Sequence, residues 1–200
     1  MRSPRFALVV AVALATVVPA VAWQRFTKQD SDLCQTKLSR IVTLGNEKRA
    51  RTAVQSTAIS DAELNAYLEY AAKDQIPHGI VEPRLMALGD GRVGAQAVVD
   101  LDAVRKQKQR GWLDPMSYLT GALPLKASGL LITKDGVGRF QLESAQVSGV
   151  TVPKTLLQEL LGYYSRTKEN PAGISMDDPF ELPARIREIQ VQQGQANIVQ

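Results

Sequence analysis

Few residues in this chain have the types and spacing that catalysis requires. His78 is the only histidine, and no motif places a nucleophile or a carboxylate next to it. Asp100/Asp102 and Asp177/Asp178 could bind a hard cation through their oxygens, but neither pair lies in a recognisable ligand loop. We therefore expect no catalytic residue, no metal site and no cofactor, and the protein is not expected to be an enzyme. A glycosidase-type carboxylate pair among the twenty acidic residues stays an open alternative.

A basic stretch next to a tryptophan is the most suggestive cluster of side chains. Arg105, Lys106, Lys108 and Arg110 precede Trp112 in the sequence. Cations beside a tryptophan suit the headgroup region of a membrane, so these five side chains are the predicted membrane-contact residues. The alternative is a solvated basic helix followed by a tryptophan that fills the core.

The N-terminal residues have the pattern of a secretory leader. Arg2 and Arg5 precede an apolar run, and residues 20–22 read Ala-Val-Ala, the small-x-small pattern of a signal-peptidase site. Residues 1–22 are therefore predicted to be a signal peptide. The alternative is an uncleaved anchor, because the apolar run at residues 6–23 is near the lower limit for a membrane span. Either way we expect an exported protein in the periplasm or cell envelope.

Charge and cysteine usage limit the partners and the covalent cross-links. Without Arg2 and Arg5, residues 23–200 carry a net charge of +2, so we expect no nucleic-acid partner. Cys34 is the only cysteine, so no intramolecular disulfide can form. Residues 23–49 are rich in charge and lack a sustained hydrophobic period, although residues 33–44 could be helical. This segment is predicted to be a flexible tether, with Cys34 as a free thiol or an intermolecular link.

A helix is predicted to begin at residue 60. Ser60 followed by Glu63 is a capping box, in which two side chains satisfy two backbone donors at a helix start. Apolar residues then recur with helical spacing from Leu64 to Ala71, which predicts one apolar stripe.

Strand-like runs joined by glycine-containing turns follow this helix. Turns are predicted at residues 89–91, 135–136 and 193–194. In the strand after the first turn, Ala95 and Ala97 lie on the predicted inner face, and their small size would let something bulky approach.

The middle hairpin raises the question of what covers its second apolar patch. With Asp-Gly at residues 135–136 as a type I′ turn, Leu131 pairs with Phe140 on one face of the sheet. Leu130, Ile132 and Val137 then point to the other face. Either the proline-containing loop at 166–183 or the first helix covers them, or they form an exposed site for a partner or a membrane.

A second helix is predicted at residues 153–165. Its leucines and tyrosines span an arc of about 160°, wider than the ~100° that a helix on a flat sheet needs. The wide arc predicts contact on more than one side of this helix.

The stretch SDAELNAYL at residues 60–68 resembles the opening of exported tubular lipid-binding (TULIP-like) bacterial proteins. These include LmeA-type phospholipid-binding proteins and YceB-type envelope lipoproteins. The order of helix, hairpins, second helix and final hairpin over about residues 50–200 is also similar. The resemblance implies a strongly curved sheet around a helix, with room for acyl chains and no catalytic residues. Cys34 departs from the lipoprotein members, because small residues do not precede it.

We predict an α+β fold in which a strongly curved antiparallel sheet made of hairpins packs around two amphipathic helices, as a single domain at residues 50–200. The predicted function is to bind or carry a lipid or similar amphiphile in a cleft between sheet and helices. The predicted lipid-binding residues are Leu131, Phe140, Leu157, Leu161 and Tyr164. Two alternatives stay open: an ordinary filled core, and a structural or assembly module that binds an envelope protein through the apolar patch.

Overall fold

The computed structural model describes residues 26–47, 54–103, 121–166, 170–173 and 175–200. The predicted signal peptide or anchor, and the predicted membrane-contact residues Arg105, Lys106, Lys108, Arg110 and Trp112, lie outside these ranges. Among the helices of the described residues, none is long and apolar enough to cross a membrane.

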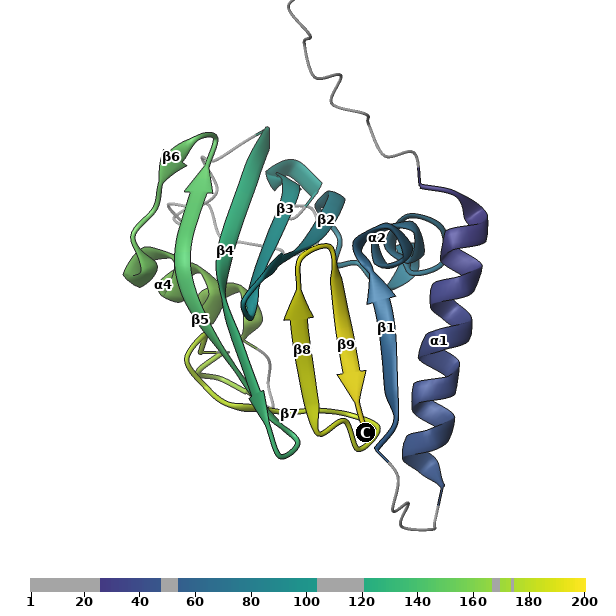
Figure 1. Ribbon diagram of the computed structural model, residues 1–200. Helices are drawn as coiled ribbons and strands as arrows, with labels where there is room; N and C mark the ends of the chain where they lie inside the picture. Colours follow the sequence, from purple (N-terminus) through teal and green to yellow (C-terminus); the bar gives the residue numbers. More distant parts are fainter. Residues whose placement is uncertain (1–25, 48–53, 104–120, 167–169, 174) are drawn as a thin grey trace, which may run out of the picture.

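Strands and helices follow one another along the chain (Figure 1). The elements are α1 Lys28–Asn46, β1 Ser56–Ser60, α2 Asp61–Tyr70, η1 Lys73–Gln75, β2 Ile80–Gly89, β3 Arg92–Asp100, β4 Ala122–Lys134, β5 Val137–Val147, β6 Val150–Thr151, α4 Lys154–Ser165, β7 Phe180–Glu181, β8 Glu188–Gln192 and β9 Gln195–Val199.

The strands form two antiparallel sheets. A six-stranded sheet has the order β2-β3-β4-β5-β6, with β7 paired to β5, and a three-stranded sheet has the order β1-β9-β8. The two sheets meet where β8 lies beside β4: the Thr133 hydroxyl accepts a hydrogen bond from Ile189 N (2.8 Å) and lies 3.1 Å from Ile189 O. The prediction of an α+β fold built on antiparallel hairpins is confirmed.

The β4–β5 hairpin has the predicted register. Asp135 and Gly136 form its turn with positive φ angles of 51° and 85°, as a type I′ turn requires. Leu131 pairs with Phe140, as expected. A bulge next to Gly129 adds one residue to β5 and keeps the apolar side chains on one face on both sides of the irregularity.

The prediction of a flexible tether at 23–49 is wrong for residues 28–46, which form the folded helix α1. Thr27 and Asp30 make a capping box at its start. Its buried residues are Ser31, Cys34, Ile41 and Gly45, a stripe of mostly small residues at helical spacing. Small residues let the helix approach its neighbours closely: a Cβ atom on Gly45 would collide with the backbone carbonyl of Ala184. Cys34 is therefore buried, with 0% of its surface exposed, and is not in a mobile segment.

The hydrophobic core lies between α1, α2 and the three-stranded sheet. Its buried residues are Cys34, Ile41, Ile59, Leu182 and Ile186. Half-buried side chains from α1, α2, β8 and β9 pack around them. The core therefore lies at the right of Figure 1, away from most of the six-stranded sheet.

An ion pair joins α1 to the capping box of α2. Lys37 Nζ lies 2.6 Å and 2.7 Å from the two carboxylate oxygens of Glu63, which also accepts a hydrogen bond from Ser60 N. Burial raises the pKa of Glu63, but the hydrogen bonds from Lys37 and Ser60 outweigh it and leave this pKa below its ordinary value. The predicted capping box is confirmed and is also a contact between two helices.

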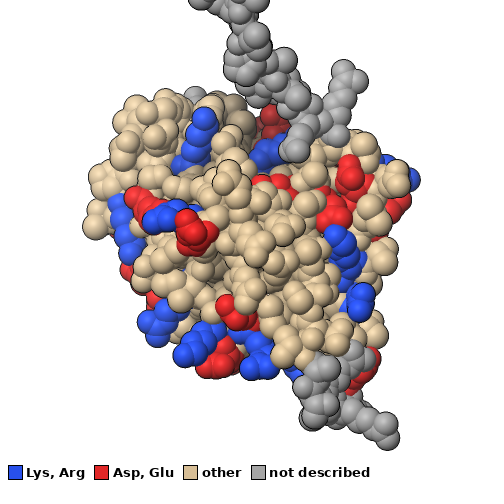
Figure 2. All heavy atoms as spheres, in the orientation of Figure 1, with Lys and Arg blue, Asp and Glu red and all other residues tan. Residues whose placement is uncertain are grey.

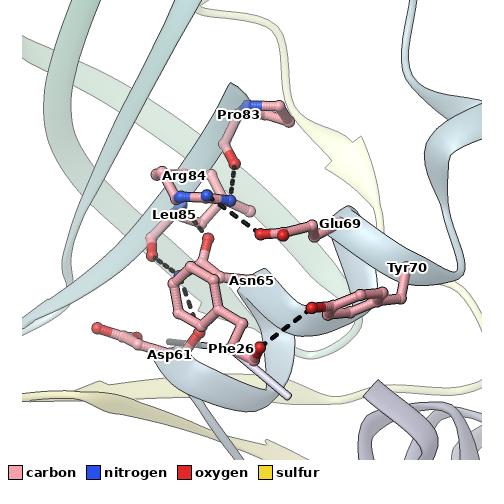
Figure 3. Close-up of polar contacts among 8 residues, drawn as sticks. All are labelled: Phe26, Asp61, Asn65, Glu69, Tyr70, Pro83, Arg84 and Leu85. Atoms are coloured by element: carbon pink, nitrogen blue, oxygen red, sulfur yellow. Dashed lines mark hydrogen bonds and ion pairs between the residues drawn. The ribbon is translucent and has the colours of Figure 1, made fainter. Parts of the chain in front are cut away.

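Helix α2 closes the edge of the six-stranded sheet with its side chains (Figure 3). The Asn65 amide accepts a hydrogen bond from Leu85 N and donates one to Leu85 O, both at 2.8 Å. The Asp61 carboxylate accepts from Ala87 N at 3.0 Å. These contacts occupy backbone groups of β2 that another strand could otherwise use, and Pro83 on the same edge has no N–H to offer.

Candidate lipid-binding face

The register of β2 to β5 divides the six-stranded sheet into an apolar face and a mixed face, because paired residues point the same way. The apolar face carries the side chains of Leu85, Ala87, Val93, Ala95, Ala97, Val99, Leu123, Leu125, Ala127, Leu131, Phe140, Leu142, Ala145 and Val147. Among the described side chains of this face, only that of Thr133 is polar. Its hydroxyl is hydrogen-bonded to the backbone of Ile189 in β8.

Most of this apolar face is incompletely buried. Of the described side chains that form this face, Ala145 is buried and the others are half-buried or exposed. Leu85 has 36% of its surface exposed. Ala95, Ala127 and Ala145 are paired in register across β3, β4 and β5, so the middle of the face is shallow. The structure thus has a compact core in one place and a broad apolar face of low burial in another.

Helix α4 packs against β5 and passes behind it in Figure 1. The loop after α4 covers one side of this helix: Met176 N donates to the Gln158 side chain at 2.7 Å, and the backbone near Gly173 lies close to Gly162. Leu156 keeps 46% of its surface exposed. The contacts of the loop are with Gln158 and Gly162, outside the apolar arc, so the predicted contact of that arc on more than one side stays a prediction.

The structure locates four of the five predicted lipid-binding side chains. Leu131 and Phe140 are paired on the apolar face. Leu157 and Leu161 are half-buried on α4. The side chain of Tyr164 lies outside the described part of the chain.

Sequence reasoning missed two ring-on-glycine contacts at one end of the apolar face. The Phe140 ring covers Gly129, whose Cβ position would be 2.6 Å from it. The Phe180 ring covers Gly138, with a corresponding distance of 2.5 Å. Glycine inside a strand marks a close approach. These two glycines were therefore the available signal, although the distant Phe180 could not be assigned from them.

The mixed face carries the second apolar patch of the β4–β5 hairpin, formed by Leu130, Ile132 and Val137. Ile132 and Val137 are 42% and 43% exposed, and Leu130 is half-buried. Of the alternatives considered for this patch, cover by the loop or the first helix or exposure to solvent, the structure shows exposure at Ile132 and Val137. Arg92 and Glu143 form an ion pair on this face at 3.1 Å. On the side of the molecule shown in Figure 2, acidic and basic side chains are interspersed and neither sign forms a continuous patch.

A separate open pocket of about 720 Å³ lies between the end of α2 and the start of β2. His78 is one of its lining residues and is exposed. The Arg84 guanidinium lies 3.1 Å from Glu69 and 4.6 Å above the Phe26 ring (Figure 3). Among the described residues lining this pocket there is no serine, threonine or cysteine, so it offers His78 no hydroxyl or thiol partner.

Comparisons with known proteins add little to this description. No protein-family model matches the chain, and no curated protein matches its sequence. A crystal structure titled lipopolysaccharide binding protein is similar at 14% sequence identity and a TM-score of 0.22, over 72% of this chain. This chain covers 40% of the length of that protein.

Proposed function

We propose that this protein is an exported, non-catalytic protein of the cell envelope that binds or carries a lipid or similar amphiphile between the apolar face and α4. The observation that supports the proposal is the incomplete burial of thirteen of the fourteen aligned apolar side chains, in a protein whose core lies elsewhere. An apolar surface of this breadth is stabilised by an apolar partner, because removing it from water is favourable.

The chemistry of the face favours an aliphatic chain as that partner. Thr133 is its one described polar side chain and is already bonded, so a polar ligand group placed there would lose its hydrogen bonds to water. Each methylene group that leaves water contributes about 0.8 kcal/mol, and an acyl chain brings many. Selection by shape is therefore expected to be broad with respect to the headgroup.

The basic cluster remains part of the proposal as a site of membrane contact. Arg105, Lys106, Lys108 and Arg110 would each contribute about 1 kcal/mol near an anionic surface, which holds a protein weakly and reversibly. Trp112 would lie at the headgroup level.

The test of lipid binding is native mass spectrometry and solvent extraction of gently purified protein. The wild type should carry lipid, and the double variant Leu157→Lys, Leu161→Lys should carry none, because two charges would then face the aliphatic chain. Ile132→Lys, on the mixed face, is the matched control and should retain lipid. Circular dichroism of each variant checks the fold. A wild type that carries no lipid and takes none from vesicles would contradict the proposal.

A second function, an assembly module that binds an envelope protein, is favoured by the exposed patch of Leu130, Ile132 and Val137. Under this alternative Ile132→Lys should remove a copurifying protein partner, while the wild type carries no lipid. The same control variant therefore separates the two functions.

A further inference from the structure

Both segments that the sequence directs to a membrane join the described structure at the same end of the molecule, at the top of Figure 1. The leader segment, residues 1–25, precedes Phe26. The basic segment, residues 104–120, carries the predicted basic cluster. We call this end the pocket end, because it carries the pocket between α2 and β2. The two segments are far apart in the sequence, so only the fold brings their points of attachment together.

The leader segment joins the fold beside the pocket. The Arg84 guanidinium, which lines the pocket, lies 4.6 Å from the centre of the Phe26 ring (Figure 3). The carbonyl oxygen of Phe26 accepts a hydrogen bond from the Tyr70 hydroxyl at 3.2 Å. These two contacts fix the point of attachment at the end of α2.

The two ends of the basic segment are held beside the same pocket. Asp100 N donates a hydrogen bond at 2.7 Å to the oxygen of Gly79, a residue that lines the pocket. The Asp100 carboxylate accepts from Asp102 N at 3.0 Å, and the Asp102 carboxylate accepts from Gly121 N at 3.1 Å. The chain therefore enters and leaves the basic segment at one place, next to the start of β2.

Chain length limits how far the membrane-directed residues can lie from the pocket end. An extended chain advances by at most about 3.5 Å per residue. Trp23 is therefore within about 10 Å of Phe26, whether it ends an anchor or begins the mature chain. Arg105, the first cation of the basic cluster, is within about 7 Å of Ala103. A bilayer that holds either segment must lie close to this end.

The described surface of the pocket end combines exposed apolar side chains with charges of both signs. Tyr70 and Val81 are exposed. The charged residues that line the pocket are Glu69, Lys73, Asp74, Glu82 and Arg84. Since three of these five are acidic, they do not attract an anionic surface, and the attraction is assigned to the basic cluster.

We propose that the pocket end faces an anionic phospholipid bilayer, with the side chains of Tyr70 and Val81 at the level of the headgroups. This inference rests on the membrane contact in the proposed function, and it adds the surface of the folded protein that meets the bilayer. The β4–β5 turn then points away from the bilayer, because β4 runs from the pocket end to this turn over thirteen residues, or about 40 Å of extended strand.

The test compares two single variants that carry a fluorophore sensitive to the polarity of its surroundings. Lys73→Cys places the label at the pocket end, and Lys134→Cys places it beside the β4–β5 turn. Both lysines are exposed, and each variant loses one positive charge, so the two are matched. Cys34 is fully buried and does not compete for the label. The protein is purified in the form in which cells produce it, and vesicles of phosphatidylcholine and phosphatidylglycerol are added at low salt.

The label at residue 73 should become brighter and shift to shorter wavelength when vesicles are added, and the label at residue 134 should not change. Cosedimentation without a shift at residue 73, or with an equal or larger shift at residue 134, would overturn the proposed surface and leave membrane contact intact. A protein that does not cosediment would overturn the membrane contact itself. Extraction of lipid from the purified protein tests lipid binding separately.

A second pair of variants needs no label. Val81→Asp and Val137→Asp introduce the same charge into strands at positions that are 45% and 43% exposed. Val81→Asp should weaken cosedimentation about tenfold, because anionic headgroups repel the new carboxylate. Val137→Asp, beside the β4–β5 turn, should cosediment like the wild type. Equal vesicle affinity of the two variants would overturn the proposal.

Discussion

At the scale of single residues, Cys34 shows how burial determines chemistry. Burial raises the pKa of its thiol from 9.0 to about 11; the Glu63 carboxylate adds to this rise and Lys37 opposes it. Metal binding and disulfide exchange require the thiolate, which this environment disfavours. Cys34 therefore behaves as a small core residue of α1.

The raised pKa predicts a loss of stability at alkaline pH. The unfolded thiol ionises near pH 9, whereas the folded thiol keeps its proton up to about pH 11. The contribution of this thiol to the free energy of unfolding is therefore fully present below pH 9 and is lost between pH 9 and about 11. Urea unfolding across this range measures it. Cys34→Ala, which cannot ionise, should show a shallower decrease, and identical pH profiles for the two proteins would contradict the prediction.

At the scale of elements, Asn65 joins α2 to the edge of β2 in the manner of a neighbouring strand. Asn65→Leu keeps a similar volume but leaves the N–H and C=O of Leu85 without this partner. Each backbone group left unpaired in a buried place costs about 1–3 kcal/mol, so we expect a loss of a few kcal/mol in the free energy of unfolding.

Urea denaturation of the Asn65→Leu variant is the measurement. Glu69→Gln, on the same helix at a site with 36% exposure, is the control and should change stability little, because exposed ion pairs contribute about 0–1 kcal/mol. An unfolding midpoint for Asn65→Leu equal to that of the control would mean that water replaces the amide at this edge.

At the scale of the whole molecule, the core and the proposed binding face are separate. The core lies between α1, α2 and the three-stranded sheet, whereas the apolar face belongs to the six-stranded sheet. A change that fills the face should therefore affect ligand binding more than folding.

Ala127→Phe tests this separation. The new ring would lie in the shallow middle of the apolar face, beside Ala95 and Ala145, and occupy space otherwise available to an aliphatic chain. We expect less extractable lipid per protein and an unfolding midpoint near that of the wild type. Ser128→Phe places the same ring on the other face of the same strand and should leave lipid content unchanged. Equal lipid content in the two variants would contradict a binding site on this face.

The sequence by itself determined the features that depend on neighbours along the chain. The Asp-Gly turn at 135–136 and the alternation of apolar residues predicted the register of Leu131 with Phe140. The pair Ser60 and Glu63 predicted the start of α2. In each case the interacting groups are separated by a few residues or by one tight turn, so their geometry follows from local backbone preferences.

Only the tertiary structure decided the features that join distant segments. Residues 28–46 were predicted to be a tether because the buried side of α1 consists largely of small residues and so shows little hydrophobic periodicity. These small residues stabilise the helix by letting it approach partners such as Ala184 closely. The stacking of Phe180 on Gly138 is equally invisible, because the two residues meet only when β7 pairs with β5. Periodicity shows that a face is apolar, but what covers that face depends on contacts that only the folded chain makes.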